Sequence, residues 1–317
     1  MTHPTLTARS RQGSGRLADL LFRGSSRIAA GVIVVLLILI ALLLAWTSRL
    51  TWETFGLTFI TGQTWDPVAA VFGALPFIVG TVLAASLAVI VAAPIGIFTA
   101  IFLSELAPRR IATPLTFMIE LLAAIPSVVI GLWGVFILAP FLRDTIETWI
   151  VSLFGWIPFL GGPAHGIGLF TAAVILAIMI LPTIVTISRE VIQAVPGSQR
   201  EAMFALGATR WETIRRAVVP YARSGIIGAV ILGLGRALGE TLAVTMVIGN
   251  KDAIPNGLFD QAQTIASKIA TSFSEASVGI ETSSLIALGL VLLILTVILN
   301  VIARLLVWRV AGPIESE

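Results

Sequence analysis

Six long apolar stretches, separated by more polar connections, set the hydropathy pattern of this 317-residue chain. A helix needs about 20 apolar residues to cross the roughly 30 Å hydrocarbon core of a bilayer. The stretches that reach or approach this length are 28–46, 75–103, 111–142, 166–187, 224–249 and 284–307. The pattern therefore predicts an all-α, polytopic integral membrane protein with six transmembrane helices.

Prolines and flanking charges refine this prediction. The second and third stretches contain Pro94 and Pro126 and are long enough to tilt or break. Membrane helices tolerate such prolines where neighbouring groups satisfy the freed backbone. The first stretch follows Arg23 and Arg27, but it is too long for the apolar core of a signal peptide, and residues 44–47 offer no small-x-small cleavage site. We expect it to be a retained first span.

The arginines indicate which side of the membrane each connection faces, because cytoplasmic loops are enriched in Lys and Arg. With the N-terminus in the cytoplasm, the inside segments hold Arg9, Arg11, Arg16, Arg23, Arg27, Arg109, Arg110, Arg189, Arg200, Arg210, Arg215, Arg216, Arg223, Arg304 and Arg309. The outside segments hold Arg49, Arg143, Lys251 and Lys268. We therefore expect a protein of the cell (inner) membrane with both termini in the cytoplasm.

This topology divides the chain into one membrane domain and two tails. The predicted parts are a cytoplasmic tail at 1–27, a six-helix permease domain at 28–307 and a cytoplasmic tail at 308–317. The first 25 residues, rich in Ser, Arg and Gly, are expected to be disordered. The largest cytoplasmic loop is predicted at 188–223.

Composition excludes several other classes of protein. Hydrophobic residues make up 57% of the chain and charged residues 12%, against about 25% charged in an ordinary soluble domain. The excess of arginine is explained by topology rather than by nucleic-acid binding. The chain has no cysteine, and His3 and His165 stand alone, so we expect no metal site, no cofactor and no catalytic residue. A zinc protease is disfavoured because His-Glu-x-x-His is absent.

Two helix-start signatures lie close together in the large cytoplasmic loop. Ser198 precedes Glu201 by three residues, and Thr209 precedes Glu212 by the same spacing, which is that of a capping box. Gly207 lies between them, where a helix end favours a left-handed residue. The loop is predicted to hold a short helix at 199–206, a glycine turn and a second helix from 210. Local chemistry alone is equally consistent with an ordinary connection between helices.

The same loop resembles the EAA loop of bacterial ABC importer permeases. That motif reads Glu-Ala-Ala, three residues, Gly, nine residues, Ile-x-Leu-Pro. Glu201, Ala202, Gly207 and Pro220 match it, whereas an apolar residue replaces the family's residue at three positions, namely Met203, Ala217 and Val219. The resemblance implies that the short helix, with Glu201, Ala202 and Gly207, couples the permease to an ATPase. The chain has no Gly-x-x-x-x-Gly-Lys-Ser/Thr stretch, so the ATPase is expected to be a separate polypeptide.

Several further stretches resemble the PstC-type permease of phosphate importers. They are 72–81, 100–108, 119–129, 235–241 and 264–270. This resemblance implies phosphate as the substrate. It also implies a PstA-type second permease, a PstB-type ATPase dimer and a periplasmic PstS-type phosphate-binding protein. A sulfate or molybdate permease is the alternative within the same class. A stand-alone channel or secondary transporter is the alternative outside it, although such transporters usually show paired broken helices in two related halves.

Intramembrane charges are the candidate substrate contacts. Arg236 and Glu240 lie four residues apart in the fifth stretch, hence on one face of a continuous helix. They either neutralise each other beside Gly235 and Gly239, or Arg236 meets a tetrahedral oxyanion with its planar guanidinium while Glu240 orients it. The PstC-type resemblance favours the second reading, since it implies important roles for both residues.

Three more residues are weaker pathway candidates. They are Glu120, Ser127 and Thr241. For Glu120, a buried and hydrogen-bonded structural role competes with a pathway role.

Overall fold

The computed structural model describes residues 13–311, and the side chains of residues 22–305. Within this part of the chain, six helices are long and apolar enough to cross a membrane. They span Phe22–Thr47, Leu75–Leu106, Ser127–Phe154, Leu169–Gln193, Arg210–Gly239 and Ile280–Leu305. The chain is a mostly helical, multi-pass membrane protein, which confirms the fold class that the hydropathy pattern predicts.

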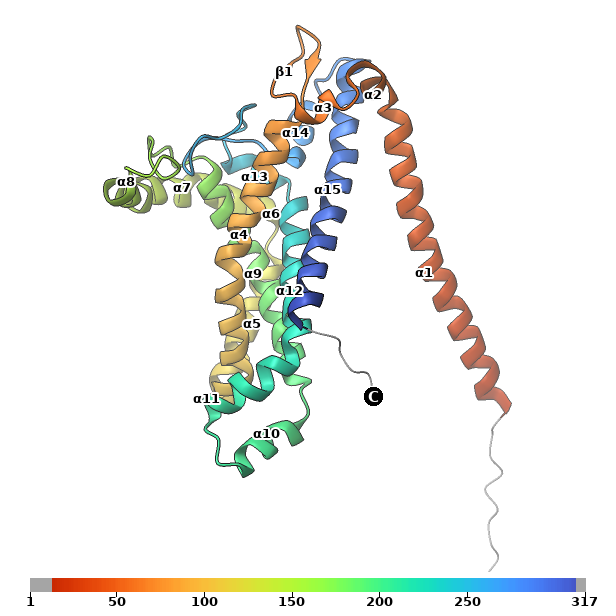
Figure 1. Ribbon diagram of the computed structural model, residues 1–317, viewed down its shortest axis with the longest axis vertical. Helices are drawn as coiled ribbons and strands as arrows, with labels where there is room; N and C mark the ends of the chain where they lie inside the picture. The colour runs from red at the N-terminus through yellow and green to blue at the C-terminus, as the bar shows by residue number, and fades with distance from the viewer. Residues whose placement is uncertain (1–12, 312–317) are drawn as a thin grey trace, which may run out of the picture.

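The long helices run between two ends, which we name after short helices found there (Figure 1). The α10 end carries α10 (Gly197–Ala205) and α11 (Arg210–Thr213). The α14 end carries α2 (Arg49–Phe55), α3 (Thr58–Thr61), α14 (Ile265–Ser272) and a two-stranded antiparallel sheet. The strands of that sheet are β1 (Trp65–Asp66) and β2 (Val71–Phe72), with Trp65 opposite Phe72.

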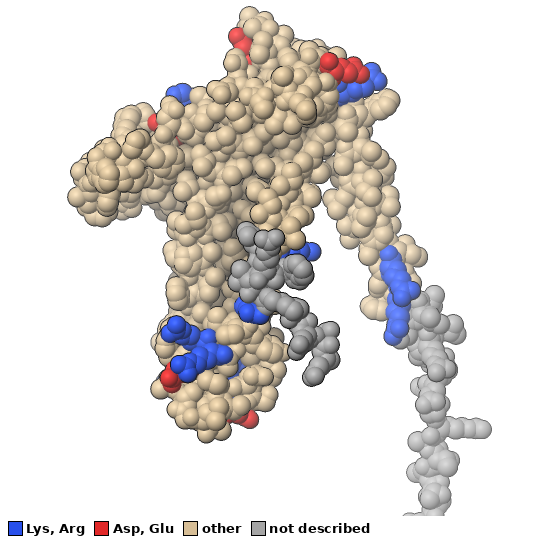
Figure 2. Space-filling model, in the orientation of Figure 1, with Lys and Arg blue, Asp and Glu red and all other residues tan. Residues whose placement is uncertain are grey.

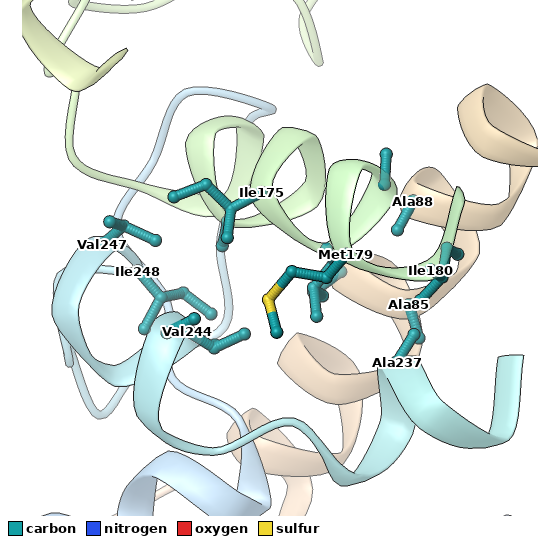
Figure 3. Close-up of a cluster of buried hydrophobic side chains, with 14 of the residues drawn as sticks. Ala85, Ala88, Ile175, Met179, Ile180, Ala237, Val244, Val247 and Ile248 are labelled. Carbon is teal, nitrogen blue, oxygen red and sulfur yellow. The ribbon is translucent and has the colours of Figure 1, made fainter. Parts of the chain in front are cut away.

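Three helices with small residues on their facing sides form the centre of the bundle. They are α4 (Leu75–Ile101), α9 (Leu169–Gln193) and α12 (Val219–Gly239). Ala85 and Ala88 of α4 are buried in a cluster with Ile180 of α9 (Figure 3). Gly233 of α12 faces Ile184, so close that an added Cβ would lie 3.0 Å from it. Small residues allow membrane helices to approach this closely, and dispersion contacts then hold them together.

The first helix, α1 (Gly13–Thr47), stands apart from this centre. It meets the bundle near α2 and α15 (Ile280–Ala311) and then diverges from them toward the α10 end (Figure 1). At the junction Thr51 Oγ1 donates a hydrogen bond to Ser283 Oγ at 2.8 Å. None of the residues in the most apolar stretch of this helix is buried against the rest of the structure. It therefore presents an unpartnered apolar surface on nearly every side.

The ends of the chain depart from the predicted tails. α1 begins at Gly13, so disorder is the wrong prediction for 13–25, while 1–12 lies outside the described residues. α15 continues to Ala311, into the predicted C-terminal tail, whose last part at 312–317 is also outside the described residues. Both terminal helices are thus longer than their apolar cores.

The third span is broken at Pro126. α4 ends in a π-helical turn, η1 (Phe102–Leu106), and α5 (Arg109–Ala124) then leads back into the bundle. Ile125 is extended, with ψ of 128°, because a residue that precedes proline disfavours the helical region. The chain restarts as α6 (Ser127–Trp133) and continues through η2 (Gly134–Leu138), α7 (Ala139–Phe141), η3 (Leu142–Glu147) and α8 (Thr148–Phe154). The prediction of one span at 111–142 is therefore wrong.

The part that follows this break runs across the bundle. α7 and α8 project sideways from it, nearer to the α14 end than to the α10 end (Figure 1). Pro94, by contrast, lies inside the continuous helix α4 and does not interrupt it.

The fifth span is broken at Glu240. α11 leads through a π-helical turn, η4 (Ile214–Val218), into α12, which ends at Gly239. Glu240 is extended, with φ −69° and ψ 125°, and α13 (Leu242–Val247) follows. The prediction of one helix at 224–249 is therefore wrong in its last third. α13 packs against α6, where an added Cβ at Gly131 would lie 3.0 Å from Ala243 Cα.

Candidate functional site

The predicted site residues fall into two groups, one at the α10 end and one halfway along the bundle. Glu201, Ala202 and Gly207 belong to α10 and the turn that follows it. Arg236, Glu240 and Thr241 lie around the break in the fifth span, and Ser127 begins the helix after the break in the third. Glu120 lies on α5, one turn before that break.

The helix α10 begins earlier than predicted. Pro196 occupies the N-cap position with φ −57° and ψ 138°, and the first helical residue is Gly197. Ser198 is therefore inside the first turn and does not cap the helix, so the capping box predicted for Ser198 and Glu201 is wrong. Proline fixes φ and readily stands at the start of a helix, which explains why it displaces the serine. Glu201 and Ala202 are both exposed on α10.

The turn after α10 matches the prediction. Gly207 has φ of +80°, and its N–H donates to the carbonyl of Phe204 at 2.9 Å. The Ala208 N–H reaches back to the Met203 carbonyl at 3.1 Å, which closes the end of the helix. An added Cβ at Gly207 would meet no described atom within 4 Å, so only the backbone conformation requires glycine here.

The second capping box is confirmed. Thr209 Oγ1 accepts from the Glu212 N–H at 3.3 Å, and Glu212 Oε2 accepts from the Thr209 N–H at 2.8 Å. α11 therefore starts at Arg210, as predicted. The turn and the cap together hold α10 at a defined angle to α11.

An ion pair that the sequence does not reveal ties α10 to the membrane helices. Arg200 donates to both carboxylate oxygens of Glu105, from Nη2 at 2.6 Å and from Nε at 3.3 Å. It also donates to the carbonyls of Val195 and Ile192 at 2.6 and 3.0 Å. Glu105 lies in η1 at the end of α4, and the two carbonyls lie at the end of α9. The sequence does place Glu105 in a stretch typical of the family, but not opposite Arg200.

The α10 end exposes apolar side chains among its charged ones. Three large side chains are exposed there, with Phe204 at 48%, Leu206 at 84% and Trp211 at 56%. Isolated apolar residues on a surface are ordinary, whereas these three lie close together in sequence, on or directly after α10 and at the start of α11.

Arg236 lies halfway along the bundle. Its neighbour Ala237 packs in the cluster that holds Ala88 and Ile180, which are at the middle of α4 and α9 (Figure 3). The Arg236 side chain itself is exposed, and it lines a groove between α12 and α15. A charge at this depth costs about 2.5–3.5 kcal/mol on insertion scales, so such arginines usually face a cavity or a partner.

Glu240 does not neutralise Arg236. Because α12 ends at Gly239, the two residues are not on one face of a continuous helix, and no ion pair joins them among the described residues. Glu240 Oε1 instead accepts from the Ala243 N–H at 3.4 Å, at the start of α13. The predicted packing beside Gly235 and Gly239 is also not made in this chain, since an added Cβ at either would meet nothing within 4 Å.

The three weaker candidates differ in their surroundings. Glu120 is exposed on α5, so its prediction as a buried, hydrogen-bonded structural residue is wrong for the single chain. Ser127 is partly buried at the start of α6. The Thr241 carbonyl accepts from Thr245 Oγ1 at 2.7 Å, within α13. Arg236, Glu240, Ser127 and Thr241 thus surround the two helix breaks.

Solved structures of ABC importers share this fold. An inward-facing MetNI methionine ABC transporter aligns with a TM-score of 0.56 at 16% identity, covering 79% of this chain and 100% of that one. A bacterial ABC transporter that imports the acidic polysaccharide alginate aligns with the same score at 17% identity, covering 94% and 100%. The architecture is therefore the ABC importer permease fold.

Curated relatives are much closer in sequence. "Phosphate transport system permease protein PstC" of Mesorhizobium japonicum is 48% identical over 298 residues, covering 93% of this chain and 91% of the relative. The protein of the same name from Pasteurella multocida is 44% identical, covering 93% of each chain. "Phosphate transport system permease protein PstC 2" of Mycobacterium tuberculosis is 40% identical, covering 96% of each.

A family model covers most of the chain. The model for the binding-protein-dependent transport system inner membrane component matches residues 92–312, a region that includes α10, its glycine turn and both broken spans. This chain belongs to the family of binding-protein-dependent transport system inner membrane components.

Proposed function

We propose that this chain is the permease subunit of an ATP-driven importer and that it moves inorganic phosphate across the cytoplasmic membrane. The observation that carries the proposal is the match of nearly the whole chain to relatives named as phosphate transport permeases. The site adds a physical argument, because an exposed arginine halfway along the bundle supplies a permanent positive charge. A guanidinium also offers paired donors that suit a tetrahedral oxyanion.

In this proposal the α10 end faces the cytoplasm. Charged side chains gather at the two ends of the visible face, and the belt between them is mostly uncharged (Figure 2). The loops and helix ends near α10 carry Arg109, Arg110, Arg189, Arg210, Arg215, Arg216 and Arg223. The positive-inside rule then supports a cytoplasmic location for this end and for both termini.

The ATPase is a separate subunit that docks on α10. The exposed apolar side chains around α10 supply the contact surface, and Arg200 transmits its movement to α4 and α9. Glu201, Ala202 and Gly207 set the angle at which this surface is presented. A PstB-type ATPase dimer is the partner that fits the named relatives.

Two further partners complete the importer. A PstA-type permease packs beside this chain, and the unpartnered surface of α1 is one face available to it. A PstS-type binding protein delivers phosphate at the α14 end. Phosphate then passes the helix breaks, where Arg236 meets the anion and Glu240, Thr241, Ser127 and Glu120 line its path.

Reconstitution tests this proposal directly. The permease is purified with its partner subunits and binding protein, and ATP hydrolysis and uptake are measured with phosphate, sulfate and molybdate in turn. Stimulation and uptake are expected with phosphate only. Equal responses to sulfate or molybdate, or uptake by the chain without an ATPase, would contradict it.

A further inference from the structure

A groove between α12 and α15 is lined by Arg236 and by two polar residues of α15 that are distant from it in the sequence. Its volume is about 610 Å³, and it is open to the outside of the chain. Asn300 and Arg304 of α15 line it together with Arg236. Asn300 and Arg304 lie four residues apart, hence on one face of their helix. The groove therefore holds two guanidinium groups and a carboxamide, with Arg236 halfway along the bundle and Arg304 at the end of the sixth span, which closes at Leu305.

Neither Arg236 nor Arg304 forms an ion pair with any described residue, and the groove is otherwise lined by apolar side chains such as Leu232 and Val301. A positive charge at the depth of Arg236 is costly unless a cavity, an anion or a carbonyl compensates it. An anion bound in the groove would compensate both arginines.

Asn300 supplies an independent observation. Its Oδ1 atom is buried and has no hydrogen-bond partner. Buried polar atoms are nearly always paired, and the donors that line this groove are the guanidinium groups. If Oδ1 accepts from an arginine, the two Nδ2 hydrogens remain available to an acceptor in the groove. The acceptor must carry several oxygens in order to serve the asparagine and both arginines together.

We propose that the groove is a binding site for a phosphate group, held by Arg236, Arg304 and Asn300. The group is either free phosphate or the headgroup phosphate of a membrane lipid, whose chains the apolar lining would accommodate. In the first case the site rests on the proposed function and extends it. α15 runs toward the α10 end while α12 runs away from it, so Arg304 lies closer to that end than Arg236 (Figure 1). Arg304 would then receive the anion after Arg236.

Phosphate binding to the assembled, detergent-purified complex tests the site. Radiolabelled inorganic phosphate is titrated onto the wild type and onto Arg304→Gln, Arg304→Lys and Asn300→Asp. Arg223→Gln is the control, because Arg223 is an exposed arginine of α12 that does not line the groove. Binding is expected to weaken about tenfold or more in Arg304→Gln and Asn300→Asp. Arg304→Gln removes a charged hydrogen-bond donor, and Asn300→Asp replaces two N–H donors with a carboxylate that repels the anion. Arg304→Lys should fall between them and the wild type, since it keeps the charge and loses the fork.

A second arm distinguishes the two sources of the phosphate group. Phosphatidylglycerol retained by each complex is measured by native mass spectrometry, and the same lipid is added as a competitor of labelled phosphate. A free-ion site shows no competition and no change in retained lipid. A lipid site shows competition, and Arg304→Gln loses the lipid while Arg223→Gln keeps it. Wild-type binding of both phosphate and lipid by Arg304→Gln and Asn300→Asp would overturn the proposal.

Failure of the groove site can be distinguished from failure of the proposed function. Uptake by the wild type tests whether the importer moves phosphate, whereas the variants test only the groove. If the wild type imports phosphate and Arg304→Gln binds and imports it equally well, the groove site is refuted and the proposed function stands. If the wild type imports no phosphate but Arg304→Gln loses lipid that the wild type retains, the proposed function is refuted and the groove site stands. Complexes are compared at equal amounts of co-purified subunits, so that a folding defect is not counted as lost binding.

Discussion

Arg200 and Glu105, 95 residues apart in the chain, form a two-pronged ion pair between α10 and the end of α4. Both side chains are mostly buried, with 22% and 13% of their surface exposed. The same guanidinium holds two carbonyls at the end of α9. A force applied to α10 therefore reaches the two most closely packed helices of the bundle through one side chain.

Breaking this pair is expected to uncouple ATP hydrolysis from transport. Arg200→Gln removes the charge and leaves the Glu105 carboxylate without its partner, at a cost of about 1–3 kcal/mol in the stability of this end. Uptake per assembled complex should fall strongly while membrane insertion remains. The exchange Arg200→Glu with Glu105→Arg should recover part of the activity that each single reversal loses. Arg215→Gln, at an exposed arginine of the same loop, is the control, and an equal defect there would argue against a special role for Arg200.

The glycine turn offers a test of backbone geometry alone. Gly207 is left-handed and an added Cβ would meet no described atom within 4 Å, so Gly207→Val is expected to fail through strain rather than through a clash. A left-handed conformation costs a side chain about 1–2 kcal/mol, and more when it is β-branched. Gly207→Asn is the matched control, since asparagine tolerates this region. Val should reduce ATPase co-purification and uptake, and Asn should largely preserve them. Equal loss in both variants would point to a side-chain clash with the partner instead.

The helix break before Glu240 predicts how Arg236 responds to mutation. Arg236→Gln should stop uptake while the complex still assembles, and Arg236→Lys should rescue poorly because an ammonium lacks the planar fork. Glu240→Gln should alter uptake without loss of assembly. Since the two residues are not paired, the double change Arg236→Gln with Glu240→Gln should remain inactive. Uptake per assembled complex is the measurement, and full recovery in the double variant would contradict a contact between Arg236 and the anion.

Single cysteines test the proposed orientation, because the chain has none of its own. Ser198 is exposed on α10, and Val68 is 97% exposed next to β1 at the α14 end. Ser198→Cys should react with a membrane-impermeant maleimide only after the cells are opened, and Val68→Cys should react in intact cells. Each variant is first shown to support uptake. Labelling of Ser198→Cys from outside intact cells would reverse the proposed topology.

Local signals in the sequence were enough to determine the number of spans and the start of α11. Membrane spans follow from length and hydropathy alone, since backbone groups in a bilayer must be satisfied within the helix. The Thr209–Glu212 cap and the Gly207 turn depend on residues within a few positions of each other, so their spacing predicts them. The resemblance of the loop to the EAA motif likewise depends on a short stretch of chain, which lies within the region that the family model matches.

Tertiary structure decided the features that join distant parts of the chain. Pro126 and the length of its stretch allowed for a break in the third span, but the hydropathy pattern did not place it and gave no sign of the break at Glu240. Both breaks lie where α6 and α13 pack together, so they depend on that contact. The pairing of Arg200 with Glu105, and the position of Arg236 and Arg304 along one groove, depend on how helices pack across the bundle. No spacing along the chain encodes such contacts, since they arise only when each helix finds the small residues that let it approach its neighbour.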